Sequence, residues 1–308
     1  MNTAPRLEGP AWPIAAVERD TGLSKDTLRV WERRYGFPQP VRDSSDERAY
    51  PPEQVERLRL IARLLGTGQR PGRVVPLPLA QLQELAQNAT PAAPSHAATD
   101  PQQQQLLELL RQHEVAGLRR ALTQAMLNLG LGRFVTELVA PLNVRVGEAW
   151  VRGDIQVFEE HMYTESVTAV LRGAIGNTVS LPQAGRPRVL LATFPQEPHA
   201  LGLLMAEAIL TLEGCECISL GVQTPVLEIA QAAQANRAQI VGLSFSASIS
   251  PQHIQRGLQE LRAKLLPGVA LWAGGSHPAL RKRGLSGVTP VLALSDIGPL
   301  LAQWTAQR

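Results

Sequence analysis

The sequence has 308 residues, of which 44% are hydrophobic, and its formal net charge is +3. A chain of this length usually divides into two or three domains. It contains no apolar run of the roughly 18 residues that a membrane span needs, and Met1 to Pro13 lacks the apolar core of a signal peptide. We therefore expect no membrane partner and a cytoplasmic location.

The excess positive charge lies at the N-terminus. Residues 1–75 hold 13 Lys and Arg against 10 Asp and Glu, whereas residues 76–308 hold 17 of each. Lys and Arg on one surface are what a phosphate-binding face requires. Nucleic-acid contacts are therefore expected within the first 75 residues.

Residues 1–75 are predicted to form a compact helical domain with helix-turn-helix spacing. Residues 14–20 have helical apolar spacing, and Ser24 is a suitable N-cap for a second helix that runs to Tyr35. A polar loop over residues 38–48 precedes a third helix, which opens at Pro51-Pro52. One apolar stripe marks that third helix: Val55, Leu58, Ile61, Leu64 and Leu65.

A linker and a helical segment follow. We assign residues 76–100 to an interdomain linker, because Ala89 to Asp100 is rich in Ala and Pro and has no periodic apolar face. Residues 101–182 carry helical apolar stripes, with breaks at 113–116, 129–132 and 153–154. This spacing predicts a central four-helix bundle.

Residues 186–308 alternate short apolar runs with amphipathic helices, which predicts a doubly wound, Rossmann-like α/β domain with a parallel sheet. In such a sheet the ligand lies beyond the carboxyl ends of the strands. The cysteines Cys215 and Cys217 are too close for a disulfide and are predicted to be buried. The expected strands are residues 189–192, 217–220, 240–243, 269–272 and 291–293, and the helices begin near Leu201, Pro225, Pro251, His277 and Ser295.

The stretch from Leu23 to Pro38 (LSKDTLRVWERRYGFP), followed by Arg-Ala-Tyr and the third helix, resembles the winged helix-turn-helix domain of the MerR family of regulators. This resemblance implies a double-stranded DNA operator as partner, bound by a homo-oligomer. Arginine can pair with guanine edges, and cations on a wing add salt-dependent affinity for phosphates. The implied recognition-helix residues are Lys25, Thr27, Arg29 and Arg33, and the implied wing residues are Arg42, Arg48 and Tyr50.

Many members of that family dimerise through a long helix after the wing. Here residues 64–72 (LLGTGQRPG) break the helical pattern early. This departure makes the C-terminal domains candidates for the dimer or tetramer interface and leaves the mode of oligomerisation open.

Three further motifs follow successive predicted strands: EPHALG after the first, SFS at the end of the third and GG at the end of the fourth. Together they resemble the cobalamin-binding fold of methionine synthase and the corrinoid methyltransferases. On that resemblance His199 Nε2 is the lower axial ligand of cobalt and Glu197, which stands where Asp is more usual, orients it. The resemblance also implies that Gly202 admits the corrin, that Ser244 and Ser246 bind the nucleotide tail, and that Gly274 and Gly275 leave room for it.

The helical segment adds a fourth motif, in which Trp150 precedes Glu160-His161 by ten residues. This spacing resembles the cap of the light-sensing B12 regulators of the CarH/LitR type. It implies that Trp150 covers the upper face of adenosylcobalamin and that Glu160 and His161 contact the adenosyl group. Val151 stands where the best-known sensor has a histidine that replaces the lost adenosyl group, so a bis-histidine photoproduct is doubtful and His161 is the alternative ligand.

The combined expectation is a DNA-binding transcription regulator, a repressor, controlled by adenosylcobalamin bound between the helical cap and the α/β domain. Light sensing through cleavage of the cobalt–carbon bond, with a change of oligomeric state, rests on the resemblance alone. The alternative is a MerR-type regulator that responds to cobalamin without light, or to another ligand or partner.

A third hypothesis, a corrinoid-carrying methyltransferase subunit, explains the cap and the sheet but not the N-terminal domain. The sequence shows no Ser/His/Asp triad, Walker loop or zinc-ligand cluster, so we expect no enzymatic turnover.

Overall fold

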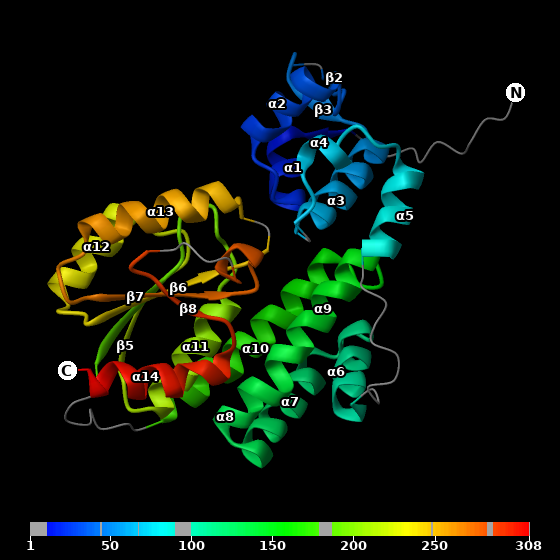
Figure 1. Ribbon diagram of the computed structural model, residues 1–308. Coiled ribbons are helices and arrows are strands. Elements are labelled where there is room, and N and C mark those ends of the chain that lie inside the picture. Colours follow the sequence, from blue (N-terminus) through cyan, green and yellow to red (C-terminus); the bar gives the residue numbers. More distant parts are fainter. Residues whose placement is uncertain are drawn as a thin grey trace, which may run out of the picture. The chain divides into compact units, whose positions relative to one another are not determined.

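The computed structural model describes residues 11–43, 45–66, 68–89, 100–178, 187–247, 249–281 and 286–307 (Figure 1). These residues belong to two compact units. The first contains Met1–Ala98 with Gly147–Val157, and the second contains Thr99–Val146 with Phe158–Arg308.

The first unit contains a helix-turn-helix followed by a small antiparallel sheet. Its sheet has the order β1-β3-β2, in which β2 and β3 form the wing. The elements are β1 (Trp12–Pro13), α1 (Ile14–Thr21), α2 (Lys25–Tyr35), β2 (Val41–Arg42), β3 (Arg48–Tyr50), α3 (Pro52–Gly66), α4 (Pro71–Val74) and α5 (Leu79–Ala89).

Local sequence signals define α2 and its packing. The Ser24 hydroxyl accepts a hydrogen bond from the Thr27 amide at 3.1 Å, which caps the helix, and Gly36 ends it with φ +67°. Leu28 and Trp31 are buried against the apolar stripe of α3. The helix-turn-helix and wing predicted from the sequence are therefore confirmed.

Helix α5 lies inside the range that the sequence analysis assigned to the linker. It packs against α3, and its Leu82 and Ala86 are buried in the same core. Leu79, Leu82 and Ala86 do repeat at helical spacing, so the assignment of residues 76–100 to a linker is wrong over this helix. The part of the predicted linker over residues 90–99 lies outside the described residues.

The helical cap has four helical segments, and the breaks between them fall where the sequence predicted them. Within the third, π-helical geometry over Phe134–Val139 joins α8 to α9 without interruption. The segments are α6 (Pro101–Arg111), α7 (Val115–Leu129), α8 (Leu131–Arg133) continuing into α9 (Ala140–Arg152), and α10 (Val157–Asn177).

The α/β domain is a five-stranded parallel sheet of order β5-β4-β6-β7-β8. Helices α11 and α14 cover one face, and α12 and α13 cover the other (Figure 1). The elements are β4 (Arg188–Ala192), α11 (Leu201–Leu212), β5 (Glu216–Gly221), α12 (Val226–Ala235), β6 (Ile240–Phe245), α13 (Pro251–Lys264), β7 (Ala270–Gly275), the 3₁₀ turns η2 (Pro278–Arg281) and η3 (Leu294–Asp296), β8 (Thr289–Val291) and α14 (Ile297–Ala306).

This architecture confirms the predicted fold class, with one local difference. The helix expected near His277 is only the four-residue turn η2. Cys215 and Cys217 are free thiols, the first buried and the second half-buried, and burial raises the pKa of Cys217 to about 12. Across the described part of the chain, no helix combines the length and the apolar character that crossing a bilayer demands.

Candidate cofactor and DNA-binding sites

The strand order places two loops side by side at the carboxyl edge of the sheet. Strand β4 lies between β5 and β6, so the chain leaves β4 and β6 at a point where the sheet changes direction of winding. The loop after β4 carries Glu197 and His199, and the turn after β6 begins at Ser246. Parallel α/β sheets bind their ligands at such a switch point.

Glu197 holds His199 in one orientation. Its carboxylate oxygen Oε1 lies 2.6 Å from His199 Nδ1 and also accepts the His199 amide at 3.2 Å, while Oε2 accepts the Ser246 amide at 2.6 Å. The Glu197 side chain is 1% exposed, whereas that of His199 is 60% exposed. With Nδ1 bonded to the carboxylate, Nε2 is the ring nitrogen left to face a ligand.

The electrostatics of the pair are reciprocal. The hydrogen bond that His199 donates to Glu197, opposed by burial, raises the pKa of His199 above its ordinary value, and the charge of Glu160 on α10 adds to this rise. Burial works against ionisation of Glu197, but hydrogen bonds from His199 and Ser246 outweigh it, so the pKa of Glu197 is lowered. The buried carboxylate is therefore charged, and its two oxygens accept hydrogen bonds from His199 and Ser246.

Thr193 supports this loop, and the sequence analysis did not single it out. Its buried hydroxyl donates to the carbonyl oxygen of Glu197 at 2.7 Å and accepts the Gln223 amide at 2.8 Å. It thus connects the loop after β4 to the loop after β5. Its position directly after a predicted strand was the only available signal.

Packing within the fold accounts for the glycines of the predicted cofactor motifs, because neighbouring atoms lie close to where a Cβ would be. A Cβ on Gly202 would lie 2.7 Å from Ser244 Oγ, and a Cβ on Gly275, where φ is +113°, would lie 2.2 Å from the carbonyl oxygen of Phe245. A Cβ on Gly274 would lie 3.1 Å from the carbonyl oxygen of Val291. A side chain at Gly275 would collide with backbone, and one at Gly202 or Gly274 would require a neighbour to shift, whether or not a ligand is bound.

Ser246 also has a different contact from the one predicted. Its amide, together with its side chain, stabilises the carboxylate of Glu197. Ser244 directs its hydroxyl toward the position beside Gly202. A direct contact of either serine with a ligand tail stays a prediction.

The cap contributes charged groups on α10 in the same unit. Glu160 Oε1 accepts the Thr164 hydroxyl at 2.7 Å, and Glu160 Oε2 lies 3.7 Å from His161 Nε2. The side chain of His161 is 68% exposed. The charge of Glu160 adds to the rise in the pKa of His199, so Glu160 acts electrostatically on His199.

Trp150 and Val151 lie in the segment that belongs to the first unit. The guanidinium carbon of Arg63 lies 5.7 Å from the centre of the Trp150 ring, and a Cβ on Gly66 would lie 3.6 Å from that ring. Val151 is buried. The role of Trp150 as a cover for a ligand stays a prediction.

The donor set fits a cobalt corrinoid better than a free metal ion. Among the residues that the structure describes, no group of three or more His, Cys, Asp or Glu could hold a metal. A metal carried inside a macrocycle needs only one protein ligand, and an exposed imidazole with a buried carboxylate behind it is a suitable one. His199 provides that arrangement.

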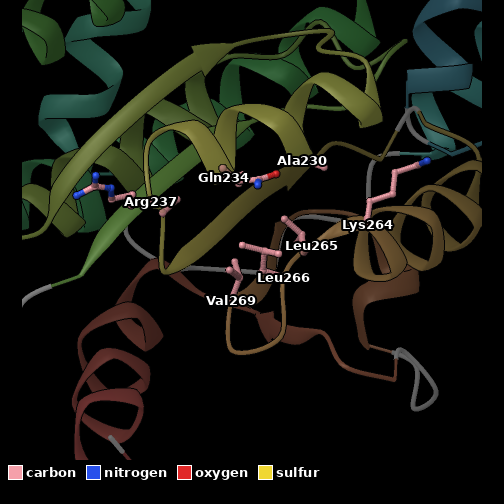
Figure 2. Close-up of a pocket in the computed structure, with 9 residues that line it drawn as sticks. Ala230, Gln234, Arg237, Lys264, Leu265, Leu266 and Val269 are labelled. Carbon is pink, nitrogen blue, oxygen red and sulfur yellow. The ribbon is translucent and has the colours of Figure 1, made fainter.

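A cavity elsewhere in the domain does not belong to this site. Figure 2 shows its lining, which comes from the ends of α12 and α13 and the residues that follow them, including Gln234, Arg237 and Lys264. The volume of the cavity is about 200 Å³. Strands β6 and β7 begin just after these residues, so the cavity lies at the amino edge of the sheet. His199 lies at the opposite edge.

The predicted DNA-binding residues lie on α2 and the wing. Arg29 and Arg33 are exposed on α2, and Arg29 forms an ion pair with Asp26 at 3.2 Å. Lys25 Nζ lies 3.7 Å from Glu18. Thr27 takes part in the cap of α2, with its hydroxyl 2.8 Å from that of Ser24.

The wing residues differ from one another. Arg42 is exposed and contacts Asp46, whereas Arg48 donates to Glu32 at 3.0 Å. Tyr50 was predicted to help grip the phosphate backbone, but its side chain is fully buried in the core of the first unit. In the structure Tyr50 is a core residue, and a phosphate contact from it stays a prediction.

Comparison with known proteins identifies the family. Residues 13–75 match the MerR HTH family regulatory protein, and residues 102–172 and 187–291 match two descriptions of a B12 binding domain. The chain is 33% identical over 276 residues to the HTH-type transcriptional repressor CarH of Myxococcus xanthus, spanning 85% of this chain and 89% of that protein. It belongs to this family of repressors.

A second member of the family is the HTH-type transcriptional repressor CarA of Myxococcus xanthus, 30% identical over 81% of this chain and 82% of that protein. The corrinoid protein for monomethylamine from Methanosarcina barkeri shares the fold of the cap and sheet, with a TM-score of 0.53 at 13% identity, over 65% of this chain and 96% of that one. The chain is thus a B12-dependent, DNA-binding regulator, which agrees with the predicted absence of enzymatic turnover.

Proposed function

We propose that this CarH-like regulator is a repressor whose DNA binding is set by adenosylcobalamin, with His199 as the protein ligand of cobalt. One observation carries the proposal: Nδ1 of His199 is tied to the buried carboxylate of Glu197, so Nε2 faces outward. Metal-bound histidines in proteins usually have their second nitrogen held in this way.

The chain's own residues would divide the work at the cofactor. His199 would bind, Glu197 would orient the imidazole, and Ser246 and Thr193 would hold Glu197 in place. Glu160 and His161 on α10 would contact the upper side, and Trp150 would exclude water there. Bound adenosylcobalamin would supply a cobalt–carbon bond that visible light can break.

The DNA-binding unit would read an operator through α2 and hold it through the wing. Arg29 and Arg33 are exposed on one helix and are suited to base edges, while Arg42 is suited to a phosphate. A dimer or tetramer would place several such units on one operator. Because α5 folds back onto α3, we propose that the B12-binding part rather than the winged helix forms the assembly.

Val151 supports a second version, in which cobalamin acts without light. A histidine at that position would replace the adenosyl group as cobalt ligand after its loss. Valine has no donor atom and cannot bind the metal. His161 is exposed on α10 and is the alternative nitrogen donor. The two versions differ in whether illumination alters the assembly.

The test is an absorption spectrum, an oligomer size and an operator-binding curve, each with adenosylcobalamin in darkness and after green light. Wild type should bind the cofactor with a histidine-ligated spectrum, and His199→Ala should lose that ligation. If wild type binds no corrinoid, the cofactor proposal fails. If it binds but light changes neither spectrum nor assembly, the version without light stands.

Three variants sharpen the result. His161→Leu tests the alternative upper ligand, and Val151→His tests whether restoring a histidine creates a stable photoproduct. Arg133→Ala, which removes an exposed cap arginine paired with Glu137, is the matched control and should behave as wild type.

A further inference from the structure

His277 is a buried histidine that the proposed function does not use. It lies in the turn between β7 and η2 and is 4% exposed. Its Nδ1 accepts the Ala279 amide at 3.0 Å, and its Nε2 lies 3.1 Å from the carbonyl oxygen of Ile249. Because Nδ1 accepts, the proton must sit on Nε2, so a single neutral tautomer satisfies both contacts.

The contact with Ile249 reaches the turn that follows β6. That turn begins with Ser246, whose amide donates to Glu197 at 2.6 Å, and Glu197 in turn bonds His199. The ends of β6 and β7 are already close, since Gly275 leaves no space for a side chain against Phe245. His277 thus contacts the chain at Ile249, three residues beyond the Ser246 amide that donates to Glu197.

Burying a histidine costs more free energy than burying an apolar side chain, because its ring nitrogens lose their contacts with water. An apolar side chain of similar size would avoid the cost of desolvating two ring nitrogens, whereas histidine offsets that cost through hydrogen bonds such as the two at Nδ1 and Nε2. One of those bonds is local, to Ala279, but the other joins two separate loops at the carboxyl edge of the sheet.

We propose that His277 is a positioning residue of the cofactor site: through the Ile249 carbonyl it fixes the turn after β6, and hence the Ser246 amide, Glu197 and the ring of His199. This inference rests on the proposed role of His199. Without His277 the Ile249 carbonyl would lose its donor, the turn would move, and the imidazole would be presented to cobalt in more than one orientation.

The probe is aquacobinamide, a corrinoid with no lower base of its own, so any nitrogen ligation must come from the protein. His277→Leu removes both bonds, and His277→Gln keeps an amide donor near the position of Nε2. Leu280→Ala is the matched control, because it weakens packing of the buried Leu280 in the same turn η2 without removing the bond to Ile249.

His277→Leu should bind aquacobinamide about tenfold more weakly, with a smaller histidine-ligated fraction in the visible spectrum, and His277→Gln should stay within about threefold of wild type. Leu280→Ala should lower the Tm but keep the wild-type spectrum. A wild-type spectrum and affinity in His277→Leu would overturn the proposal, as would an equal loss in Leu280→Ala at matched Tm.

A second readout needs no cofactor. In the apo protein, hydrogen exchange of the Ser246 amide should accelerate about tenfold in His277→Leu and not in Leu280→Ala. If wild type shows no histidine ligation at all, the proposed function fails, while this exchange rate still decides whether His277 positions the turn. Unchanged exchange in His277→Leu would overturn the positioning role.

Discussion

Arg48 on wing strand β3 donates its Nε–H to Oε2 of Glu32 on helix α2, over 3.0 Å. The two side chains are 31% and 30% exposed, and the hydrogen bond with Glu32 is the main reason that the pKa of Arg48 is raised. A wing cation is thereby attached to the recognition helix. Part of its charge is already compensated before any DNA arrives.

Glu32→Gln should release that charge for the phosphate backbone. Operator affinity should then depend more steeply on salt, with the slope of log K against log[salt] becoming larger by about one. The unfolding free energy should fall by only about 0.5–1 kcal/mol, because the pair is partly exposed. Fluorescence anisotropy at several salt concentrations measures the slope, and an unchanged slope would place Arg48 away from the phosphates.

Arg33→Ala should weaken operator binding by about 1–3 kcal/mol and relax sequence preference, if Arg33 reads a base edge. Arg33 is exposed on α2, so its loss should leave the Tm unchanged. Binding to the operator and to a scrambled duplex of equal length separates the two effects. Arg133→Ala, in the cap, should match wild type on both duplexes, and an equal loss on both in Arg33→Ala would indicate a phosphate contact instead.

Glu197→Gln should lower the pKa of His199 in the apo protein, because Glu197 is the main cause of its rise. A histidine NMR titration measures this shift directly. Conservation of the wild-type value in the variant would mean that Glu160, the other charge acting on His199, carries the effect.

The same pair makes apo stability depend on pH. Because the pKa of His199 is raised, protonated His199 stabilises the fold. This contribution is complete below the ordinary pKa of 6.5 and is lost as pH rises through the folded pKa. Because the pKa of Glu197 is lowered, ionised Glu197 also stabilises the fold. This contribution is complete above 4.5 and is lost as pH falls through the folded pKa of Glu197. Denaturant melts of wild type minus Glu197→Gln should therefore show the largest difference between these two values, and a flat difference would contradict the coupling.

Gly202→Ala should destabilise the α/β domain by about 1–3 kcal/mol through overpacking against Ser244 Oγ. The double variant with Ser244→Ala should recover most of that loss, since the obstructing atom is gone. Gly275→Ala should cost more and should not be rescued in this way, because its obstacle is the backbone of Phe245 and its φ is positive. Urea unfolding of the three variants distinguishes these outcomes.

The spacing of apolar residues and the breaks between the helical segments were sufficient to predict the fold class from the sequence. The stripe from Val55 to Leu64 and the breaks near His113 and Gly153 correspond to the observed elements. Helix α5 was missed because the Ala- and Pro-rich stretch from Ala89 to Asp100 led to a linker assignment that also covered the residues before it. The burial of Tyr50 could not be predicted either, because a strand of only three residues gives no reliable alternation.

The candidate site was predictable in place but not in detail. Motifs at successive strand ends placed Glu197, His199 and Ser246 at one edge, as observed. What the glycines contact and which group Ser246 holds depend on three-dimensional packing between β4, β6 and β7, which no spacing along the chain encodes. The roles of Thr193 and His277 are of this second kind.

The bridge from Ser246 through Glu197 to His199 has a mechanical consequence. It joins the ends of two adjacent strands by hydrogen bonds of 2.6 Å to one carboxylate that is 1% exposed. This arrangement of Ser246, Glu197 and His199 is stiff, because moving one strand end stretches buried hydrogen bonds that water cannot easily replace. For the proposed function we therefore expect the motion that carries a signal to DNA to arise in the cap or between the protomers of the proposed assembly, while the Glu197–His199 pair stays fixed.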